Sequence, residues 1–167
     1  STVEYVSNTY EITDDFSNIL FDTDSADIEF IESSDGKTTV ECYEYKNMVH
    51  SVSVVDNTLT VTVSDTRKWY EHIGINIGTP KITVYMPKGE YADLTVNATT
   101  GDVKVAKDFK FGNAQIKIST GDIDFSATAT NNLNLKTTTG DMQLNGVFAK
   151  QIDLSLTTGV IKLNNIE

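Results

Sequence analysis

The hexapeptide TTTGDM, residues 137–142, decides the fold because the chain contains three near-copies of it. ATTGDV ends at Val103, ISTGDI ends at Ile123 and LTTGVI ends at Ile161. The turn glycines are separated by 20, 19 and 19 residues, and they are Gly101, Gly121, Gly140 and Gly159. A fixed period of this kind predicts a structural unit that stacks on copies of itself.

Apolar residues keep the same register around each of these glycines. They occupy two positions before the glycine and two positions after it, and Thr, Lys, Asn, Asp and Ser fill most of the places between them. This alternation predicts two short strands per unit, each with one buried face. The four columns are Leu94, Ala114, Leu133 and Ile152; Val96, Ile116, Leu135 and Leu154; Val103, Ile123, Met142 and Ile161; and Val105, Phe125, Leu144 and Leu163.

These patterns predict an all-β fold, a short two-sided β-solenoid or flattened β-sandwich of 19–20-residue repeats with almost no helix. We expect residues 91–167 to form four rungs about 4.8 Å apart, because one unit cannot bury its inner face alone. The alternative is an antiparallel sandwich in which each turn closes an ordinary hairpin. The equal spacing favours the solenoid, since hairpin sandwiches seldom keep one strict period.

The repeated turn has its own chemistry. Glycine adopts a positive φ at low cost, and the aspartate after it can accept hydrogen bonds from turn amides. At the last turn Val160 replaces the aspartate, which predicts that the stack ends there. A column of carboxylates is also a candidate calcium site, but each turn offers few other oxygens, so turn formation is favoured and no cofactor is expected. The aspartates are Asp102, Asp122 and Asp141.

A divergent copy of the repeat lies near the N-terminus. In NILFDTDSADIEF, residues 18–30, Ala26 takes the glycine position and Asp27 the aspartate position. This similarity predicts a first rung that stacks below the regular ones. Residues 1–90 would then form an N-terminal β region, continuous with residues 91–167 in one structural domain.

The segment between this copy and the regular repeats, residues 34–90, has the signals of antiparallel hairpins. Turns are predicted at Asp35-Gly36 and at Asp56-Asn57, the latter between two alternating strands. Further strands are predicted at residues 73–77 and 81–86, which are bounded by prolines and glycines.

The net charge of −11 limits the classes of partner. Recognition of nucleic acid or of anionic lipid requires a basic surface, so neither is expected. Residues 1–50 hold 12 acids and 2 bases, whereas residues 51–167 hold 12 acids and 11 bases. The acidic third is interpreted as a solvated edge that discourages aggregation, in preference to a site for a cation or a basic partner.

Two local features remain outside the repeat. The single cysteine, Cys42, excludes an internal disulfide and is predicted to point into the core. The stretch DTRKWYEHIG, residues 65–74, places an aromatic pair among basic side chains, which could contact a sugar or a partner, or could cover an open end of the solenoid. The candidate binding residues are Trp69, Tyr70, Arg67 and His72, and the candidate outward tyrosines are Tyr43, Tyr45, Tyr85 and Tyr91.

Several motifs follow one another in a recognisable order: SADIEF at residues 25–30, ITVYMPKG at residues 82–89, and then the Thr/Ser-Thr-Gly-Asp turns. In this order they resemble the bacterial putative adhesin family, a family of domains of unknown function. The resemblance implies a secreted or membrane-anchored β-repeat protein and supplies no catalytic residues. The last turn, at Val160, departs from the family's aspartate.

The expected function is therefore contact rather than catalysis. The sequence has no nucleophile elbow, no cluster of metal-binding histidines and no phosphate-binding glycine loop. We expect an extracellular or cell-envelope protein that contacts a glycan or a protein surface through a sheet face and the Trp69 loop. One alternative is a structural or sensory module of envelope-stress signalling, and the last is a carbohydrate-active enzyme.

Overall fold

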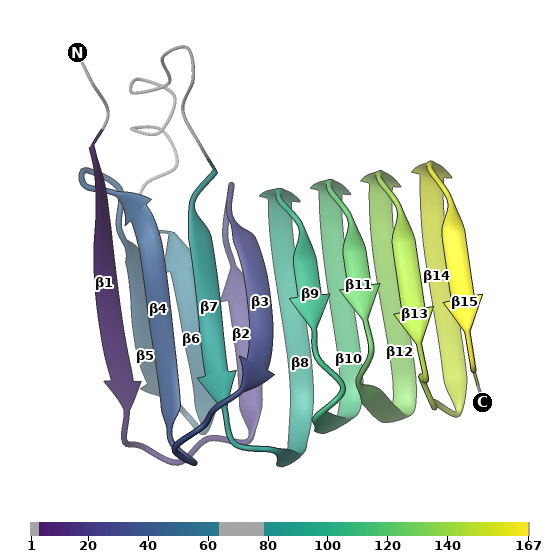
Figure 1. The fold of residues 1–167 in the computed structure, drawn as a ribbon, viewed down its shortest axis with the longest axis horizontal. Helices are drawn as coiled ribbons and strands as arrows, with labels where there is room; N and C mark the ends of the chain where they lie inside the picture. The colour runs from purple at the N-terminus through teal and green to yellow at the C-terminus, as the bar shows by residue number, and fades with distance from the viewer. Residues whose placement is uncertain (1–3, 64–78, 167) are drawn as a thin grey trace.

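The computed structural model describes residues 4–63 and 79–166, and the regular structure in these ranges consists of β-strands. The strands form two sheets that lie face to face, and the rungs follow one another along the longest axis of the molecule (Figure 1). The all-β fold and the two-sided stacking predicted from the repeat are confirmed.

The first sheet, called sheet A, has 8 strands and the second, sheet B, has 7 strands. In spatial order, sheet A contains β1 (Tyr5–Ile12), β4 (Thr38–Tyr45), β7 (Lys81–Met86), β3 (Asp27–Glu32), β9 (Val103–Val105), β11 (Ile123–Phe125), β13 (Met142–Asn145) and β15 (Ile161–Asn164). Sheet B contains β14 (Gln151–Thr158), β12 (Thr128–Thr139), β10 (Phe109–Thr120), β8 (Gly89–Thr100), β2 (Asn18–Asp22), β6 (Thr58–Val63) and β5 (His50–Val55).

Each regular rung consists of one long strand in sheet B, a turn and one short strand in sheet A, and the turn is Gly-Asp except at Gly159-Val160. Successive rungs pair in parallel and in register, so that Leu94 lies beside Ala114, Ala114 beside Leu133, and Leu133 beside Ile152. The alternative of an antiparallel sandwich is therefore wrong, because the turns join the two sheets and do not close hairpins within one sheet.

The divergent N-terminal copy forms the rung next to the first regular one, as predicted. In sheet B, Ile19 of β2 pairs with Leu94 of β8, and in sheet A, Ile28 of β3 pairs with Val103 of β9. Both sheets thus pass without a break from the N-terminal region into the repeats. The division at residues 90 and 91 stays a prediction.

Beyond this rung the sheets change to antiparallel pairing. β5 and β6 form the predicted hairpin, and its turn residues Asp56 and Asn57 have φ of 48° and 62°. The turn predicted at Asp35-Gly36 is present, with Gly36 at a φ of 72° and the N–H of Lys37 donating to Oδ1 of Asp35, and the strand predicted after it is β4. The hairpin pairing expected there is wrong, because β7 lies between β3 and β4 and pairs with both. The predicted strand at residues 81–86 is β7, whereas the one at residues 73–77 lies outside the described residues.

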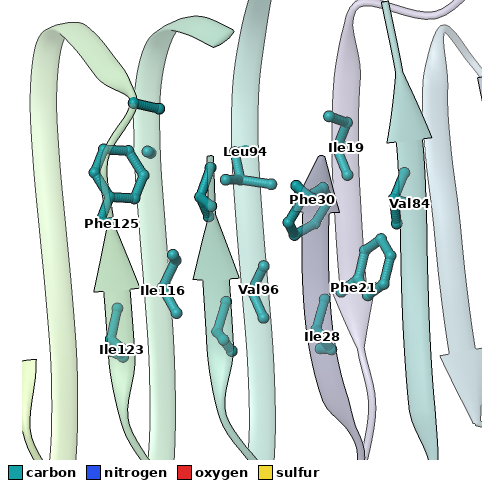
Figure 2. Close-up of a cluster of buried hydrophobic side chains, with 14 of the residues drawn as sticks. Ile19, Phe21, Ile28, Phe30, Val84, Leu94, Val96, Ile116, Ile123 and Phe125 are labelled. Atoms are coloured by element: carbon teal, nitrogen blue, oxygen red, sulfur yellow. The ribbon is translucent and has the colours of Figure 1, made fainter. Parts of the chain in front are cut away.

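The core lies between the sheets and is formed by the inward columns of successive rungs. Figure 2 shows the part of it that joins the divergent rung to the first regular rungs. Phe21 of β2 and Phe30 of β3 meet edge to face in the divergent rung, with ring centroids 5.2 Å apart. Cys42 of β4 is fully buried in the same core, as its alternation with Val40 predicts.

Candidate functional site

A ladder of aspartates connects the turns of successive rungs. The backbone N–H of Asp122 donates to Oδ1 of Asp102 over 2.8 Å, and the N–H of Asp141 donates to Oδ1 of Asp122 over 2.8 Å. The ladder begins at Asp27 of the divergent rung, whose Oδ1 accepts from the N–H of Asp102. It ends at Asp141, which accepts from the N–H of Val160.

The turn glycines are required by close contact between rungs as well as by their φ. Gly101, Gly121, Gly140 and Gly159 have φ between 135° and 150°. A Cβ atom on Gly121 would overlap the carbonyl oxygen of Gly101, and a Cβ atom on Gly140 would overlap that of Gly121. Only glycine allows the turns to stack at this spacing.

The turns do not provide a set of ligands that would hold a calcium ion. Calcium takes six to eight oxygen ligands, whereas Asp102, Asp122 and Asp141 each use Oδ1 on a backbone amide. In the part of the chain that the structure describes, no group of three or more His, Cys, Asp or Glu residues is arranged to hold a metal ion. Instead, each aspartate carboxylate accepts a hydrogen bond from the turn amide of the next rung.

The outer face of sheet B carries a polar groove across the four regular rungs. Its volume is about 500 Å³, and its walls and floor come from two neighbouring columns of outward side chains on β8, β10, β12 and β14. The strands position these side chains because alternate residues point away from the core. The columns are Asp93, Asn113, Asn132 and Gln151, and Thr95, Gln115, Asn134 and Asp153.

Hydrogen bonds between rungs hold the first column in place. The Nδ2 of Asn113 donates to Oδ1 of Asp93 over 3.0 Å, and the Nδ2 of Asn132 donates to Oδ1 of Asn113 over 3.1 Å. A carboxamide has two N–H groups and an oxygen with two lone pairs, so these bonds use only part of its capacity. The groove is therefore an ordered row of donors and acceptors that repeats once per rung.

A second hollow, of about 460 Å³, lies where the connections between sheet strands meet in the N-terminal half. Phe16 and Tyr91 line it and stack with ring centroids 6.0 Å apart, and the Tyr91 hydroxyl donates to the Pro87 carbonyl oxygen. Burial raises the pKa of Tyr91 to about 12. Carboxylates and one cation complete the lining: Glu11, Asp14, Asp15 and Lys37.

Comparison with known proteins identifies the family. A family model described as Toastrack DUF4097 matches residues 16–167. The chain belongs to this family. No curated protein matches this Toastrack chain.

A solved structure shows the same architecture. A structure named as a putative cell adhesion protein, from Clostridium sporogenes, superimposes with a TM-score of 0.70 at 10% identity, over 98% of this chain and 100% of its own. One named as a putative adhesin, from Bacteroides fragilis, has 18% identity and covers 96% of this chain and 97% of its own, but its TM-score of 0.40 carries no argument. At these identities the likeness shows the Toastrack fold alone.

The predicted aromatic site residues have different outcomes in this Toastrack chain. Trp69, Tyr70, Arg67 and His72 lie outside the described residues. Tyr43 is 48% exposed on the outer face of sheet A. The prediction that Tyr45 faces outward as part of a contact surface is wrong. Its side chain is only 6% exposed and packs beside Tyr5.

Sequence reasoning did not find Tyr5 as the partner of these tyrosines. Its ring stacks on Tyr43 with centroids 4.7 Å apart, because β1 pairs with β4 in the register that places Tyr5 opposite Tyr45. Burial raises the pKa of Tyr5. Of the other two candidates, Tyr85 is half-buried on sheet A and Tyr91 is half-buried in the hollow described above.

Sequence reasoning also missed a buried polar cluster at the N-terminal end. Glu44 of β4 is 0% exposed and His50 of β5 is 4% exposed. One carboxylate oxygen of Glu44 accepts from the backbone N–H of His50 over 2.6 Å and lies 2.9 Å from its Nδ1, and the other accepts from Asn8 over 2.7 Å. The alternation of β4, which places Glu44 on the same face as Val40 and Cys42, was the available signal.

Proposed function

We propose that this chain is a non-enzymatic contact protein of the bacterial cell surface, and that the sheet B groove binds an extended, hydroxyl-rich polymer such as a glycan. The observation that carries the proposal is the groove itself, in which amide or carboxylate side chains recur on four consecutive rungs. A polymer of repeating polar units can donate to and accept from such a row along its whole length.

The surroundings of the groove support contact at a surface. Gln115 and Asn134 are half-buried at its floor, while Asp93, Asn132 and Gln151 are exposed around it. The lining residues in the described ranges include no aromatic side chain, so affinity would come from hydrogen bonds and would be low for a short ligand. An adhesive protein gains strength by repeating such contacts along one polymer.

The other partner classes fit the chain less well. The net charge of −11 opposes binding to nucleic acid and to anionic lipid. Glu44 and His50 are buried, so a substrate cannot reach them. The pKa of the Cys42 thiol is raised to about 12, mainly by burial and to a smaller extent by Glu44, so the thiol is a poor nucleophile. No helix among the described residues is long and apolar enough to cross a membrane.

A second candidate function is recognition of a protein partner in the same envelope, as a sensory or structural module. It is supported by the hollow at Phe16 and Tyr91, which joins aromatic rings to the carboxylates Asp14 and Asp15. A basic side chain of a partner would contact both kinds of group there. Variants in this hollow therefore form the second arm of the test.

The experiment measures binding of the purified chain to an array of glycans and matrix proteins. We expect the variant Gln115→Ala with Asn134→Ala to lose binding at least about tenfold, the loss of roughly 1.4 kcal/mol expected for two hydrogen-bonding groups. The matched control is Gln143→Ala, which removes an exposed amide from the outer face of sheet A. Equal binding by the double variant would contradict the groove as the site, and loss of binding only in Phe16→Ala would favour the second candidate.

A further inference from the structure

Two lysines lie side by side on the outer face of sheet B, next to the groove. Lys117 of β10 and Lys136 of β12 are register partners on neighbouring parallel strands, so their Cα atoms are about 4.8 Å apart. Both side chains are exposed. Like charges directly opposite each other destabilise a sheet. The pair therefore opposes the pairing of β10 with β12 unless a negative group lies over it.

The outer face of sheet A has the contrasting arrangement of charge. There, Lys104 of β9 lies between Glu29 of β3 and Asp124 of β11. Glu29 also forms an ion pair with Lys81 of β7, with Nζ and Oε1 3.4 Å apart. Charge thus alternates from strand to strand on sheet A, whereas two like charges are adjacent on sheet B.

Among the described residues, no carboxylate forms an ion pair with either lysine. Lys117 lies between Asn97 and Lys136, and the other register partner of Lys136 is Ser155. Asp153 lies diagonally from Lys136, on the side away from Lys117, and its carboxylate accepts from a neighbouring glutamine amide. The two ammonium groups are therefore available to a ligand.

Hydroxyl groups border the lysine pair on the side away from the groove. Ser119 and Thr138 lie two residues further along the same two strands, and they line a hollow of about 300 Å³ together with Asn97 and the two lysines. An ammonium group only donates hydrogen bonds, while a hydroxyl group can donate and accept. An oxyanion in this hollow would accept charge-assisted hydrogen bonds from the lysines and further ones from the hydroxyls.

The lysine pair adjoins the floor of the groove. Gln115 and Asn134, at the floor, lie two residues before Lys117 and Lys136 on the same strands. A separation of two residues places all four side chains on one face, with about 6.6 Å between the two columns. A sugar unit over the floor column therefore has a lysine of the same rung within reach of a substituent on its ring.

From these observations we infer that Lys117 and Lys136 bind the carboxylate or sulfate group of an acidic glycan. The site rests on the glycan groove proposed above and adds the chemical class of its ligand. Residues 51–167 hold 12 acids and 11 bases, so the part of the chain that forms the groove is nearly neutral. Asp93 and Asp153 lie at the two ends of the groove and repel a densely charged chain such as a nucleic acid, so the glycan is sparsely charged.

Binding to three cellulose derivatives tests the site: neutral hydroxyethyl cellulose, and lightly substituted carboxymethyl cellulose and cellulose sulfate. We expect the wild-type chain to bind at least one acidic polymer at least about tenfold more tightly than the neutral one, with a preference that shrinks between about 50 and about 300 mM salt. The two acidic polymers distinguish a carboxylate from a sulfate. Equal affinity for all three polymers would overturn the inference and leave the groove proposal in place.

A matched pair of variants locates the charge effect. Lys117→Gln with Lys136→Gln removes two charges from exposed side chains, so the fold is retained, and the variant should lose the preference but keep its affinity for the neutral polymer. Lys104→Gln with Lys162→Gln changes the net charge equally on the outer face of sheet A and should keep the preference. A preference that persists in the first variant, or falls equally in both, would overturn the inference.

Two further measurements separate the lysine site from the groove and from general attraction of polyanions. Lysine-dependent binding of an acidic polymer that survives Gln115→Ala with Asn134→Ala would support the lysine site and contradict the groove. Lysine-dependent binding of a single-stranded DNA oligonucleotide, as tight as that of the acidic polymers, would overturn the inference. No binding of the wild-type chain to any of the three polymers would contradict the groove and the lysine site together.

Discussion

The two ends of this solenoid differ in how far the core between the sheets is covered. At the N-terminal end the outermost strands, β1 and β5, contact each other, so the two sheets meet and enclose the core. At the C-terminal end, β14 and β15 stop with their inward side chains partly exposed. One end is closed by antiparallel strands outside the repeat, and at the other end the last described strands belong to the repeat itself.

Glu44 is the residue that joins the strands of the closed end. Its carboxylate accepts from Asn8 on β1 and from His50 on β5, while its own backbone lies in β4. The C-terminal end has no equivalent among the described residues. A repeat therefore defines how rungs add to one another, but closing the stack requires side chains that do not follow the repeat.

The largest expected effect tests the part of the molecule that both ends share, the stacked turns. Gly121→Ala should destabilise the fold by at least about 3 kcal/mol, because its Cβ overlaps the carbonyl oxygen of Gly101 and the φ of 146° is unfavourable. Gly159→Ala should cost less, since among the described residues its rung pairs with only one neighbouring rung and can shift. Urea denaturation measures both.

Two comparisons make this prediction decisive. Gly146→Ala has open space around the new Cβ and a φ of 63°, and should cost only about 1 kcal/mol. Equal losses at Gly121 and Gly159 would show that the terminal rung is as firmly held as an internal one, and the contrast between the ends would fail.

The second effect concerns the closed end. Glu44→Ala should cost about 3 kcal/mol, because it leaves the half-buried Asn8 side chain and the buried backbone N–H of His50 without their acceptor. Glu41→Ala, an exposed position on the same strand, should change the unfolding free energy by less than about 0.5 kcal/mol. If the Glu44 variant were as stable as the wild type, the carboxylate would not be needed to close this end.

The third effect compares two leucines of one column. Leu144→Ala should cost about 3 kcal/mol, since the side chain is fully buried between the sheets. Leu163→Ala should cost less than about 1 kcal/mol, since more than half of that side chain is exposed. Urea denaturation measures both values, and similar losses would show that the last described rung is packed like the others.

The smallest effect is a pH dependence at the closed end. Burial, then Glu44 and Glu41, raise the pKa of Cys42 from 9.0 to about 12. The unfolded chain therefore loses the thiol proton first, so the stability is fully present below pH 9 and falls as the pH rises from 9 towards 12. Two half-buried tyrosines, Tyr10 and Tyr91, whose pKa is also raised by burial, act in the same direction above pH 10.

Cys42→Ala isolates the thiol from these tyrosines. Denaturation at pH 9 and at pH 10 should show a smaller loss of stability in this variant than in the wild-type chain. In the folded protein at pH 8 the thiol should also react slowly with a thiol reagent, and rapid modification would contradict its burial.

Several elements could be predicted because their cause is local or periodic. The columns through Leu94, Ala114 and Leu133, the hairpin at Asp56-Asn57 and the divergent rung at Ala26 all follow from side-chain alternation, turn preference or the repeat itself. At Asp35-Gly36 the turn and the strand after it were predicted correctly, but the hairpin pairing was not, because the two flanking strands are separated by β7. A turn sequence indicates a change of direction and does not say which strand will be the neighbour.

In the candidate site, too, some features could be predicted from the sequence and others could not. Gly121 and Asp122 could be assigned to a stacked turn from the repeat alone, because identical units impose the same geometry on each copy. The groove could not be predicted, since the outward columns of β8, β10 and β12 look like any solvated face until their side chains are placed beside one another. The cluster of Glu44, His50 and Asn8 was likewise hidden, because its members come from three strands whose pairing is set by distant contacts.

The sequence by itself thus determined the period, the two-sided stacking, the turn and the rung at which the aspartate ladder ends, because each depends on interactions between equivalent residues of neighbouring repeats. Only the tertiary structure decided which end of the stack is closed, which polar side chains are buried there and where the outer face is hollowed. These features arise from contacts between residues that no repeat relates, and their pairing is chosen by the packing of the whole core.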